Sequence, residues 1–394
     1  MLRKFRVKNF LSFRDWQTLD LTVAANAPDL PGRFVQSIPG SKERFPTFVA
    51  IFGANASGKS NLLLALTYVA SFICFSQDDP PDQEILLLPF LGNGWDKDTT
   101  EFEIEIDLPF NVSGSRHRFF YRLVISPDRS RILEEELKYY PHRKSRRLLF
   151  RRGQELQFGE DFEIGKNDPS IRKVRPNTSA ISTLAYLNHP VSENLVHSLK
   201  SIDTNLSGVL KERENQKEKS ALLYQIRPQM RKVLVDILEN FDTGIEGVEF
   251  RSTENGRSPY FRRRNIAEEI PYEFESHGTK RIFSLFPILY DVLDLGGIAV
   301  IDELDNAIHS VLLPEIVDLF VDPVRNPNNA QLIAACQNPS ILQHLEKEEV
   351  FFAEKGDDGA TEIYGLKDIR GVRRESNIYA NYLAGAFGGV PKVA

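Results

Sequence analysis

A glycine-bearing stretch near residue 55 has the residue types that hold phosphate groups. It reads GANASGKS and fits the pattern G-x-x-x-x-G-K-[ST]. Glycines let the backbone wrap tightly, so that its N–H groups face phosphate oxygens. Lys59 would then neutralise the β- and γ-phosphates, and the Ser60 hydroxyl would bind Mg²⁺. The residues expected to hold the nucleotide are Gly53, Asn55, Ala56, Ser57, Gly58, Lys59, Ser60 and Asn61.

Two adjacent acids follow an apolar run near residue 300. The run Gly297–Ile301 reads as a buried strand that ends in Asp302 and Glu303. If this strand lies beside the one that precedes the phosphate loop, Asp302 reaches the Mg²⁺ sphere. Glu303 would polarise the attacking water as general base. A strand end with two solvent-facing acids is the alternative, but the phosphate loop in the same chain speaks against it. The two adjacent acids favour hydrolysis over kinase-type transfer.

A third segment, ESHGTKR from Glu275 to Arg281, has the features of a helix start that contacts an anion. Ser276 is a good N-cap, and Gly278 lets the backbone approach an anion closely. A helix N-terminus with a serine hydroxyl suits a γ-phosphate. Lys59 already neutralises that group in the same chain, so an ordinary N-cap is the alternative. The order Ser-x-Gly turn, helix, then strand ending in Asp-Glu is that of ABC ATPases.

The elements that must position these residues indicate an α/β fold. Apolar strands are expected at 47–52, 298–301 and 332–336, with helices at 59–74, 277–294 and near 309–320. A period-two pattern from 101 to 150 predicts an antiparallel β layer. Short strands are expected at 248–251 and 272–274.

The domain organisation follows from a change of pattern in the middle of the chain. Residues 161–179 show no strand pattern and are interpreted as a linker, and about 191–240 turn helical. We expect residues 1–165 and 246–394 to form two parts of one nucleotide-binding head, separated by a helical insertion or lid at 166–245. The charged stretch 211–220 is interpreted as a solvated helix face.

Composition excludes several other classes of protein. The formal charge of −6, with 41% hydrophobic and 26% charged residues, is that of a soluble globular protein without a global nucleic-acid signature. Two cysteines in apolar runs speak against disulfides or a cysteine-bound metal. The N-terminus lacks a signal-peptide core, and apolar runs such as 85–91 are too short to span a bilayer. We therefore expect a cytoplasmic protein with no membrane contact.

Two basic clusters are the candidates for contact with nucleic acid. One comprises residues 142–147 with Arg151 and Arg152, flanked by aromatic residues, and the other is Arg262–Arg264. Arginines among aromatic rings suit phosphate contact and base stacking. The interpretation we favour for the first cluster is a charged hairpin of the β layer, with LLF inward and arginine outward.

With these residues in hand, the chain resembles the SMC/RecF/OLD-like group of ABC-type ATPases. Within that group it is similar to the stand-alone bacterial ATPases typified by RloA and the abortive-infection protein AbiLi. The motifs that carry the resemblance are VKNFLSF (7–13), GANASGKSNLL (53–63), ESHGTKRIFSLFPIL (275–289), GGIAVIDELDNAIHSVLL (296–313) and YLAGAFGGVP (382–391). The resemblance implies a P-loop head with an antiparallel β layer and a helical insertion, in which ATP and Mg²⁺ lie between two subunits.

The resemblance also assigns roles to single residues. Ser276 and Gly278 become the signature motif that meets the nucleotide of the partner subunit. His309, with Asp305 and Asn306, falls in the D-loop region beside the dimer seam. Arg14, after the Ser-Phe pair of the opening motif, is placed to reach phosphate.

The chain departs from the family pattern at two positions. Gln337 stands where ABC heads usually have the switch histidine. Glutamine can hydrogen-bond a γ-phosphate or water but cannot carry a proton, so we expect slow turnover. Gln83 is the nearest candidate for the Q-loop glutamine. OLD nucleases also carry a metal-binding Toprim domain, for which this chain leaves no room, so we expect any nuclease to be another polypeptide.

The preferred hypothesis is an ATPase of a prokaryotic anti-phage defence system. Two or more copies would close around ATP–Mg²⁺, and ATP state would control a separate nuclease or toxin, or the binding of phage-derived nucleic acid or protein. One alternative is an ATP-gated, non-catalytic scaffold that holds a toxin inactive. Another is a RecF-type DNA-repair ATPase, which predicts hydrolysis stimulated by DNA.

Overall fold

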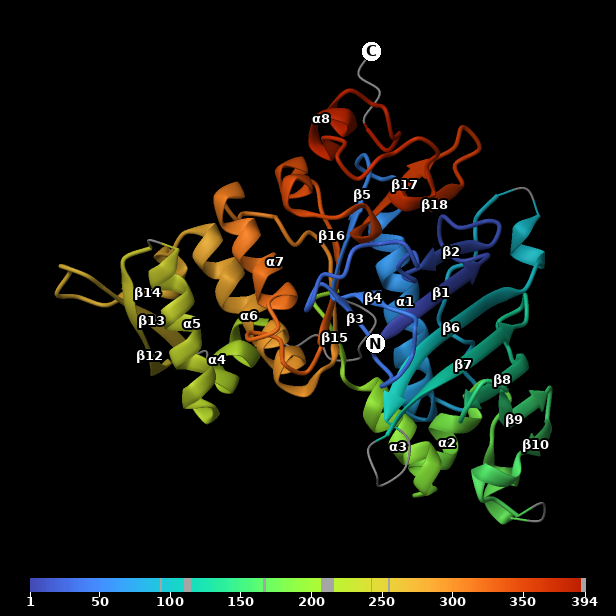
Figure 1. The fold of residues 1–394 in the computed structure, drawn as a ribbon. Helices are drawn as coiled ribbons and strands as arrows, with labels where there is room; N and C mark the ends of the chain where they lie inside the picture. The colour runs from blue at the N-terminus through green and yellow to red at the C-terminus, as the bar shows by residue number, and fades with distance from the viewer. Residues whose placement is uncertain are drawn as a thin grey trace.

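The computed structural model describes residues 1–92, 94–109, 115–165, 168–206, 216–241, 243–253 and 256–390. Part of the charged stretch 211–220 and the last residue of the closing motif, Pro391, lie outside the described residues. Two large sheets enclose a central helix on one side of the molecule, and a helical lobe with a small sheet lies on the other (Figure 1).

The central sheet consists of short apolar strands whose carboxyl ends carry the predicted motifs. Its order is β11-β15-β16-β5-β17-β18, and every neighbouring pair is parallel except β17 and β18. Strands buried on both faces read as continuous apolar runs, as here. The strands are β5 (Phe48–Phe52), β11 (Ile202–Thr204), β15 (Ile298–Ile301), β16 (Gln331–Ala335), β17 (Val350–Lys355) and β18 (Thr361–Gly365).

Alternate residues of this sheet face two different cores. In β5, Val49 and Ile51 belong to the core that contains helix α1 (Lys59–Phe75), whereas Phe48, Ala50 and Phe52 belong to the core of the helical lobe. This alternation is that of a strand in a sheet covered on both sides.

Helix α1 fills the space between the central sheet and the antiparallel layer (Figure 1). By length and composition alone, the span Lys59–Asp78 is the one helix among the described residues that could cross a membrane, contrary to the expectation from the sequence. Of its most apolar window, 61% is buried inside the protein, as in a core helix of a globular domain.

The predicted antiparallel β layer is a seven-stranded sheet in the order β10-β9-β8-β7-β6-β1-β2, and all its pairs are antiparallel. Apolar side chains on one face, such as Phe5, Ile104 and Leu123, join the core around α1. The strands are β1 (Leu2–Lys8), β2 (Gln17–Asp20), β6 (Thr100–Pro109), β7 (Arg116–Ile125), β8 (Ile132–Tyr140), β9 (Arg146–Arg152) and β10 (Glu155–Phe158).

The remaining elements cover the two cores. Helices α2 and α3 pack on α1 and the antiparallel layer, whereas α4–α7 and the small sheet β12-β13-β14 form the helical lobe (Figure 1). Their bounds are α2 (Ala180–Tyr186), α3 (Pro190–Leu199), α4 (Gln216–Ile226), α5 (Pro228–Asn240), β12 (Ile245–Thr253), β13 (Gly256–Arg263), β14 (Ile270–Pro271), α6 (His277–Leu295) and α7 (Leu313–Val321). Two short strands, β3 (Phe34–Val35) and β4 (Phe45–Pro46), form a hairpin, and α8 (Ile378–Leu383) lies near the C-terminus.

Three expectations from the sequence are wrong in detail. The helical stretch 191–240 contains strand β11, which joins the edge of the central sheet. Tyr272–Phe274 forms a 3₁₀ turn and not a strand. Strand β15 does not adjoin β5, because β16 lies between them. Strand order depends on where each crossover connection places its strand, and a local pattern carries no information about that.

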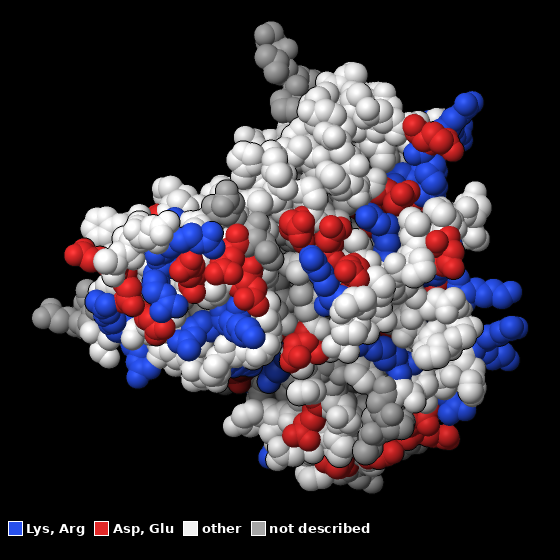
Figure 2. Space-filling model, turned by 60° about the vertical axis from the view of Figure 1, so that its left-hand side comes forward, with Lys and Arg blue, Asp and Glu red and all other residues white. Residues whose placement is uncertain are grey.

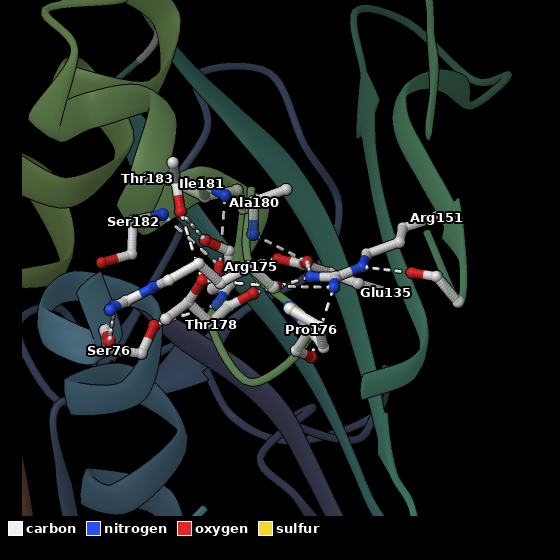
Figure 3. A network of polar contacts seen from close by, with 12 residues as sticks. Ser76, Glu135, Arg151, Arg175, Pro176, Thr178, Ala180, Ile181, Ser182 and Thr183 are labelled. Carbon is white, nitrogen blue, oxygen red and sulfur yellow. Dashed lines mark hydrogen bonds and ion pairs between the residues drawn. The ribbon is translucent and has the colours of Figure 1, made fainter. Parts of the chain in front are cut away.

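A buried polar network fixes the segment that was interpreted as a linker (Figure 3). Arg151 of β9 is fully buried and lies 3.6 Å (Nη1 to Oε2) from Glu135 of β8. Its guanidinium donates to the carbonyl oxygens of Arg175 (2.8 Å) and Thr178 (2.6 Å). Glu135 in turn accepts hydrogen bonds from the Ser179 hydroxyl (2.6 Å) and from two further donors, Tyr121 and Ala180. Arg151 therefore does not belong to the exposed basic cluster, contrary to the expectation of arginines pointing outward.

The same segment also holds the far end of α1. The backbone N–H of Ser179 donates to the hydroxyl of Ser76 (3.0 Å), which directly follows the helix. Arg175 Nη2 donates to the carbonyl oxygen of Gln77 (2.7 Å). The network thus joins the antiparallel layer, the 175–183 segment and the end of α1.

We predict that Arg151→Met lowers the free energy of unfolding by about 3 kcal/mol, because the Glu135 carboxylate would stay buried without its cation. Chemical denaturation followed by circular dichroism measures the change. The adjacent Arg152 is exposed, so Arg152→Met is the matched control and should shift stability by less than about 0.5 kcal/mol. Equal effects of the two substitutions would contradict the role assigned to the buried pair.

Candidate functional site

The predicted phosphate loop and the predicted acids meet at the carboxyl edge of the central sheet. The loop follows β5, Gln337 lies just beyond β16, and Asp302 and Glu303 follow β15. Together they line a hollow of about 440 Å³. Its lining residues are Asn55, Ala56, Lys59, Ser60, Asp302, Glu303, Ala335 and Gln337. Ligands of α/β proteins bind at this edge of a sheet, where loops from several strands converge.

The phosphate loop is held in its wrapped form by two segments far away in sequence. Gly58 has φ +108°, and a Cβ there would lie 2.4 Å from Oγ1 of Thr361. The Thr361 hydroxyl donates to the Ser57 carbonyl oxygen (2.8 Å) and lies 2.8 Å from the hydroxyl of Ser12. Asn61 Nδ2 donates to the same Ser12 oxygen (2.8 Å). Thr361 could not be predicted as a site residue, because β18 carries no motif.

Lys59 points back into the loop that precedes it. Its ammonium donates to the carbonyl oxygens of Gly53 (2.8 Å) and Ala54 (2.9 Å). Burial lowers the pKa of Lys59, and the carboxylates of Asp302 and Asp305 oppose that shift. The lysine is therefore placed between the loop and the acids, where a phosphate group would meet it.

The lining also fits the anion and the metal ion that the motif implies. Next to these lining residues in the phosphate loop, the buried hydroxyl of Ser57 has no hydrogen-bond partner among the described residues, although Ser57 itself does not line the hollow. Ser60 and Asp302 supply the oxygen ligands that Mg²⁺ prefers. These residues would hold a triphosphate with its metal ion.

The Asp302 peptide is clamped by a residue that sequence reasoning missed. Asn205 accepts a hydrogen bond from the Asp302 backbone N–H (2.8 Å) and donates to the Asp302 carbonyl oxygen (2.9 Å). Asn205 directly follows β11, the strand that the helical pattern concealed. Gln83, the predicted Q-loop candidate, does not line the hollow: its carbonyl oxygen accepts a hydrogen bond from Asn177 (2.9 Å) beyond the far end of α1. The amide side chain that contacts Asp302 is therefore that of Asn205 and not that of Gln83.

Glu303 is exposed at the rim of the hollow with its carboxylate held by two amides. Asn306 Nδ2 donates to Oε2 (2.8 Å), and Gln337 Nε2 lies 3.5 Å from Oε1. The predicted general base and the predicted switch residue therefore lie side by side. A water molecule between Glu303 and a bound phosphate would meet both of them.

The residues predicted to form the D-loop include one that holds the backbone beside the hollow and one that faces solvent. The buried carboxylate of Asp305 accepts hydrogen bonds from the backbone N–H groups of Gln337 (2.7 Å) and Asn338, and so fixes the segment that follows β16. His309 is exposed, and its Nδ1 accepts a hydrogen bond from the Val311 N–H (3.3 Å). Asp305 acts inside the chain, whereas His309 faces outward.

Neither Ser276 nor Gly278 lines the hollow of its own chain. Ser276 caps α6, since its Oγ accepts from the Thr279 N–H (3.1 Å). A Cβ on Gly278 would lie 2.8 Å from the carbonyl oxygen of Ala307, so the fold itself requires glycine there. The close approach of Gly278 to an anion, predicted from the sequence, would be a second and separate reason for glycine at this position.

Arg14 is held by acids and not by the phosphate loop. Its guanidinium pairs with Asp15 (2.8 Å) and Asp358, and it lies 5.9 Å from the ring centroid of Trp95. Arg14 does not line the hollow. Contact with phosphate would require it to leave these two carboxylates.

In each basic cluster, two arginines pair with acids at the surface. Arg147 binds Glu136 (2.9 Å), and Arg146 binds Asp161 (3.1 Å). In the second cluster, Arg263 binds Glu275 (2.6 Å) and Arg264 binds Glu246 (2.8 Å). On the face drawn in Figure 2, blue and red groups alternate over the helical lobe and form no broad field of one sign. Pairing of this kind weakens the attraction for a polyanion.

We predict that Thr361→Val weakens binding of ATP–Mg²⁺ about fivefold, because the loop loses a hydrogen bond worth about 1 kcal/mol. Titration calorimetry measures the dissociation constant. Thr361→Ser keeps the hydroxyl and serves as the matched control, with affinity close to that of the unaltered protein. A valine variant that binds as tightly as the serine variant would show that the loop is held without this hydroxyl.

Comparison with known proteins agrees with this geometry. The sequence profile of the family described as "AAA domain, putative AbiEii toxin, Type IV TA system" matches residues 48–343. No match was found among curated protein sequences.

Solved structures of SMC heads are similar to this chain. An SMC head bound to the C-winged helix domain of ScpA is 14% identical, with a TM-score of 0.51 and coverage of 92% of this chain and 96% of that chain. The SMC head domain of Thermotoga maritima is 13% identical (TM-score 0.43, coverage 92% and 98%). A head with coiled coil and joint from Pyrococcus yayanosii is 12% identical (TM-score 0.49, coverage 98% and 99%). The first of these confirms the predicted α/β P-loop head of ABC type.

Proposed function

The chain belongs to the family described as "AAA domain, putative AbiEii toxin, Type IV TA system", and on that premise we propose that it binds ATP with Mg²⁺ and hydrolyses it slowly between two copies of itself. The observation that carries the proposal is the shared hollow of Lys59, Ser60, Asp302, Glu303 and Gln337. A lysine, a hydroxyl, a metal-binding carboxylate and a general base are the parts that phosphoryl transfer to water requires.

Each residue has one task in this mechanism. Lys59 and the loop N–H groups bind the β- and γ-phosphates. Ser60 and Asp302 would hold Mg²⁺, which would neutralise charge on the phosphates. Glu303 takes the proton of the attacking water. Gln337 orients that water but cannot accept its proton, which is why we expect slow turnover.

A second copy is part of the proposal because the signature turn, Ser276 to Gly278, does not line the hollow of its own chain. Ser276 and the neighbouring His277 are exposed, and Ser276 lies at the start of a 19-residue helix. Such a helix start favours an anion. A γ-phosphate held between Lys59 of one copy and this turn of another would close the pair, and its cleavage would loosen it.

The biological role follows from the resemblance to the RloA and AbiLi type. We propose a cytoplasmic defence ATPase whose ATP state controls a separately encoded nuclease or toxin in response to phage-derived nucleic acid or protein. The description of the matching family, which names a toxin–antitoxin system, supports this direction. The SMC head that is solved with ScpA shows that this fold can bind a partner protein.

Two other functions would use the same site differently. A non-catalytic, ATP-gated scaffold is favoured by Gln337, which replaces a proton-carrying residue at the switch. A RecF-type repair ATPase would be stimulated by DNA, and the pairing of the basic clusters with acids speaks against that.

We predict that Glu303→Gln lowers the rate of phosphate release by about a hundredfold or more, because the general base is lost. ATP binding should persist, because the phosphate loop is intact. Lys59→Ala should lose ATP binding itself. Phosphate release and sedimentation with and without ATP–Mg²⁺ measure both effects, and the glutamine variant should accumulate as an ATP-bound dimer.

The unaltered protein serves as the reference in this experiment. Equal and negligible hydrolysis in the unaltered and Glu303→Gln proteins, with ATP bound in both, would favour the scaffold. Hydrolysis that rises with duplex or single-stranded DNA would favour the repair ATPase. Failure of the unaltered protein to bind ATP–Mg²⁺ would overturn the proposal as a whole.

A further inference from the structure

Arg281 joins the signature helix to the two acids. It lies in the second turn of α6, and its Nη2 donates to the carbonyl oxygens of Asp302 (2.8 Å) and Glu303 (2.7 Å). Both acceptors belong to the backbone of the acid pair and not to its carboxylates. The planar guanidinium serves two neighbouring carbonyls, which a single ammonium does less well.

Apart from these two carbonyl oxygens, the guanidinium has no partner among the described residues. Across the part of the chain that the structure describes, Arg281 forms no ion pair, and its buried Nε has no hydrogen-bond partner. Burial lowers the pKa of Arg281, and the carboxylates of Glu303, Asp302 and Asp305 oppose that shift. A half-buried cation without a salt bridge lowers the stability of the fold. The hydrogen bonds of Arg281 to the backbone of the acid pair offset that loss.

The backbone that Arg281 holds is itself strained. Glu303 has φ +50°, a left-handed conformation that costs a residue with a side chain about 1–2 kcal/mol. Asn205 clamps the Asp302 peptide from the other side. The general base is therefore aimed by two side chains that come from separate elements, one of which is the signature helix.

A second contact links the same two segments. The Ala307 carbonyl oxygen packs against Gly278 so closely that a Cβ would lie 2.8 Å from it. Ala307 also has a left-handed backbone, with φ +63°. The loop 302–307 and the first two turns of α6 are thus in contact at two places.

We propose that Arg281 is a positioning residue that couples the two nucleotide sites of the dimer. When the signature turn binds the nucleotide of the partner, Arg281 transmits the new position of α6 to Glu303, the base of its own site. Hydrolysis at one site then depends on occupancy of the other. This inference rests on the proposed function and adds a route by which the sites communicate.

The test is Arg281→Met, measured by ATP binding and by the dependence of hydrolysis rate on ATP concentration. We expect ATP affinity to stay within about twofold, because Lys59 and the phosphate loop are untouched. We expect kcat to fall by roughly tenfold to a hundredfold, as for a displaced catalytic group. The Hill coefficient should fall from a value above 1 in the unaltered protein to about 1.

Two matched variants separate positioning from stability. Arg227 also fastens α6, through Asp291, ten residues further along the helix than Arg281, so Arg227→Lys should leave kcat and the Hill coefficient unchanged. Arg281→Lys can donate to one carbonyl at a time and should recover part of kcat. Thermal unfolding of each variant shows whether lost activity reflects lost fold.

The possible outcomes are distinct. An Arg281→Met protein that keeps both kcat and cooperativity overturns the coupling while the ATPase function stands. A variant that loses ATP binding together with activity assigns Arg281 a structural role and also overturns it. Absence of ATP binding in the unaltered protein would instead be a failure of the proposed function.

Discussion

The geometry of the site depends on three parallel strands ending at one edge of a sheet. Strands β5, β16 and β15 are neighbours in that order, and each delivers one part of the chemistry: the phosphate loop, Gln337, and the two acids. Because the sheet is buried on both faces, its strands cannot slide without opening two cores. The loops are therefore built on a base that stays fixed while they bind and release a ligand.

Loops at such an edge still need local restraint, and here it comes from distant segments. Thr361 and Ser12 hold the phosphate loop, Asn205 holds the Asp302 peptide, and Asp305 holds the residues after β16. Each restraint is a hydrogen bond between a side chain and the backbone, or between two hydroxyl groups. These hydrogen bonds preorganise the site.

What could be predicted from the sequence was local, and what could not was set by contacts between distant residues. The phosphate loop and the acid pair follow from residue types at short spacing, as does the helix cap at Ser276. Strand β11 has three residues, too few for a period to show, and with it Asn205 was missed. The burial of Arg151 depends on Glu135 in the neighbouring strand, and the pattern of β9 alone puts every arginine outside.

Helix α1 has a property that follows from its two ends. It begins at Lys59 in the phosphate loop and ends beside Ser76, which is tied to the buried network around Arg151 (Figure 3). The 17 residues make a rod about 25 Å long, packed along its length, so it can translate but has little room to bend. Such a rod couples its two ends, so a displacement of the phosphate loop along the helix axis would act on the network around Arg151. The antiparallel layer therefore has two connections to the site: Ser12 beside the phosphate loop, and this network at the far end of α1.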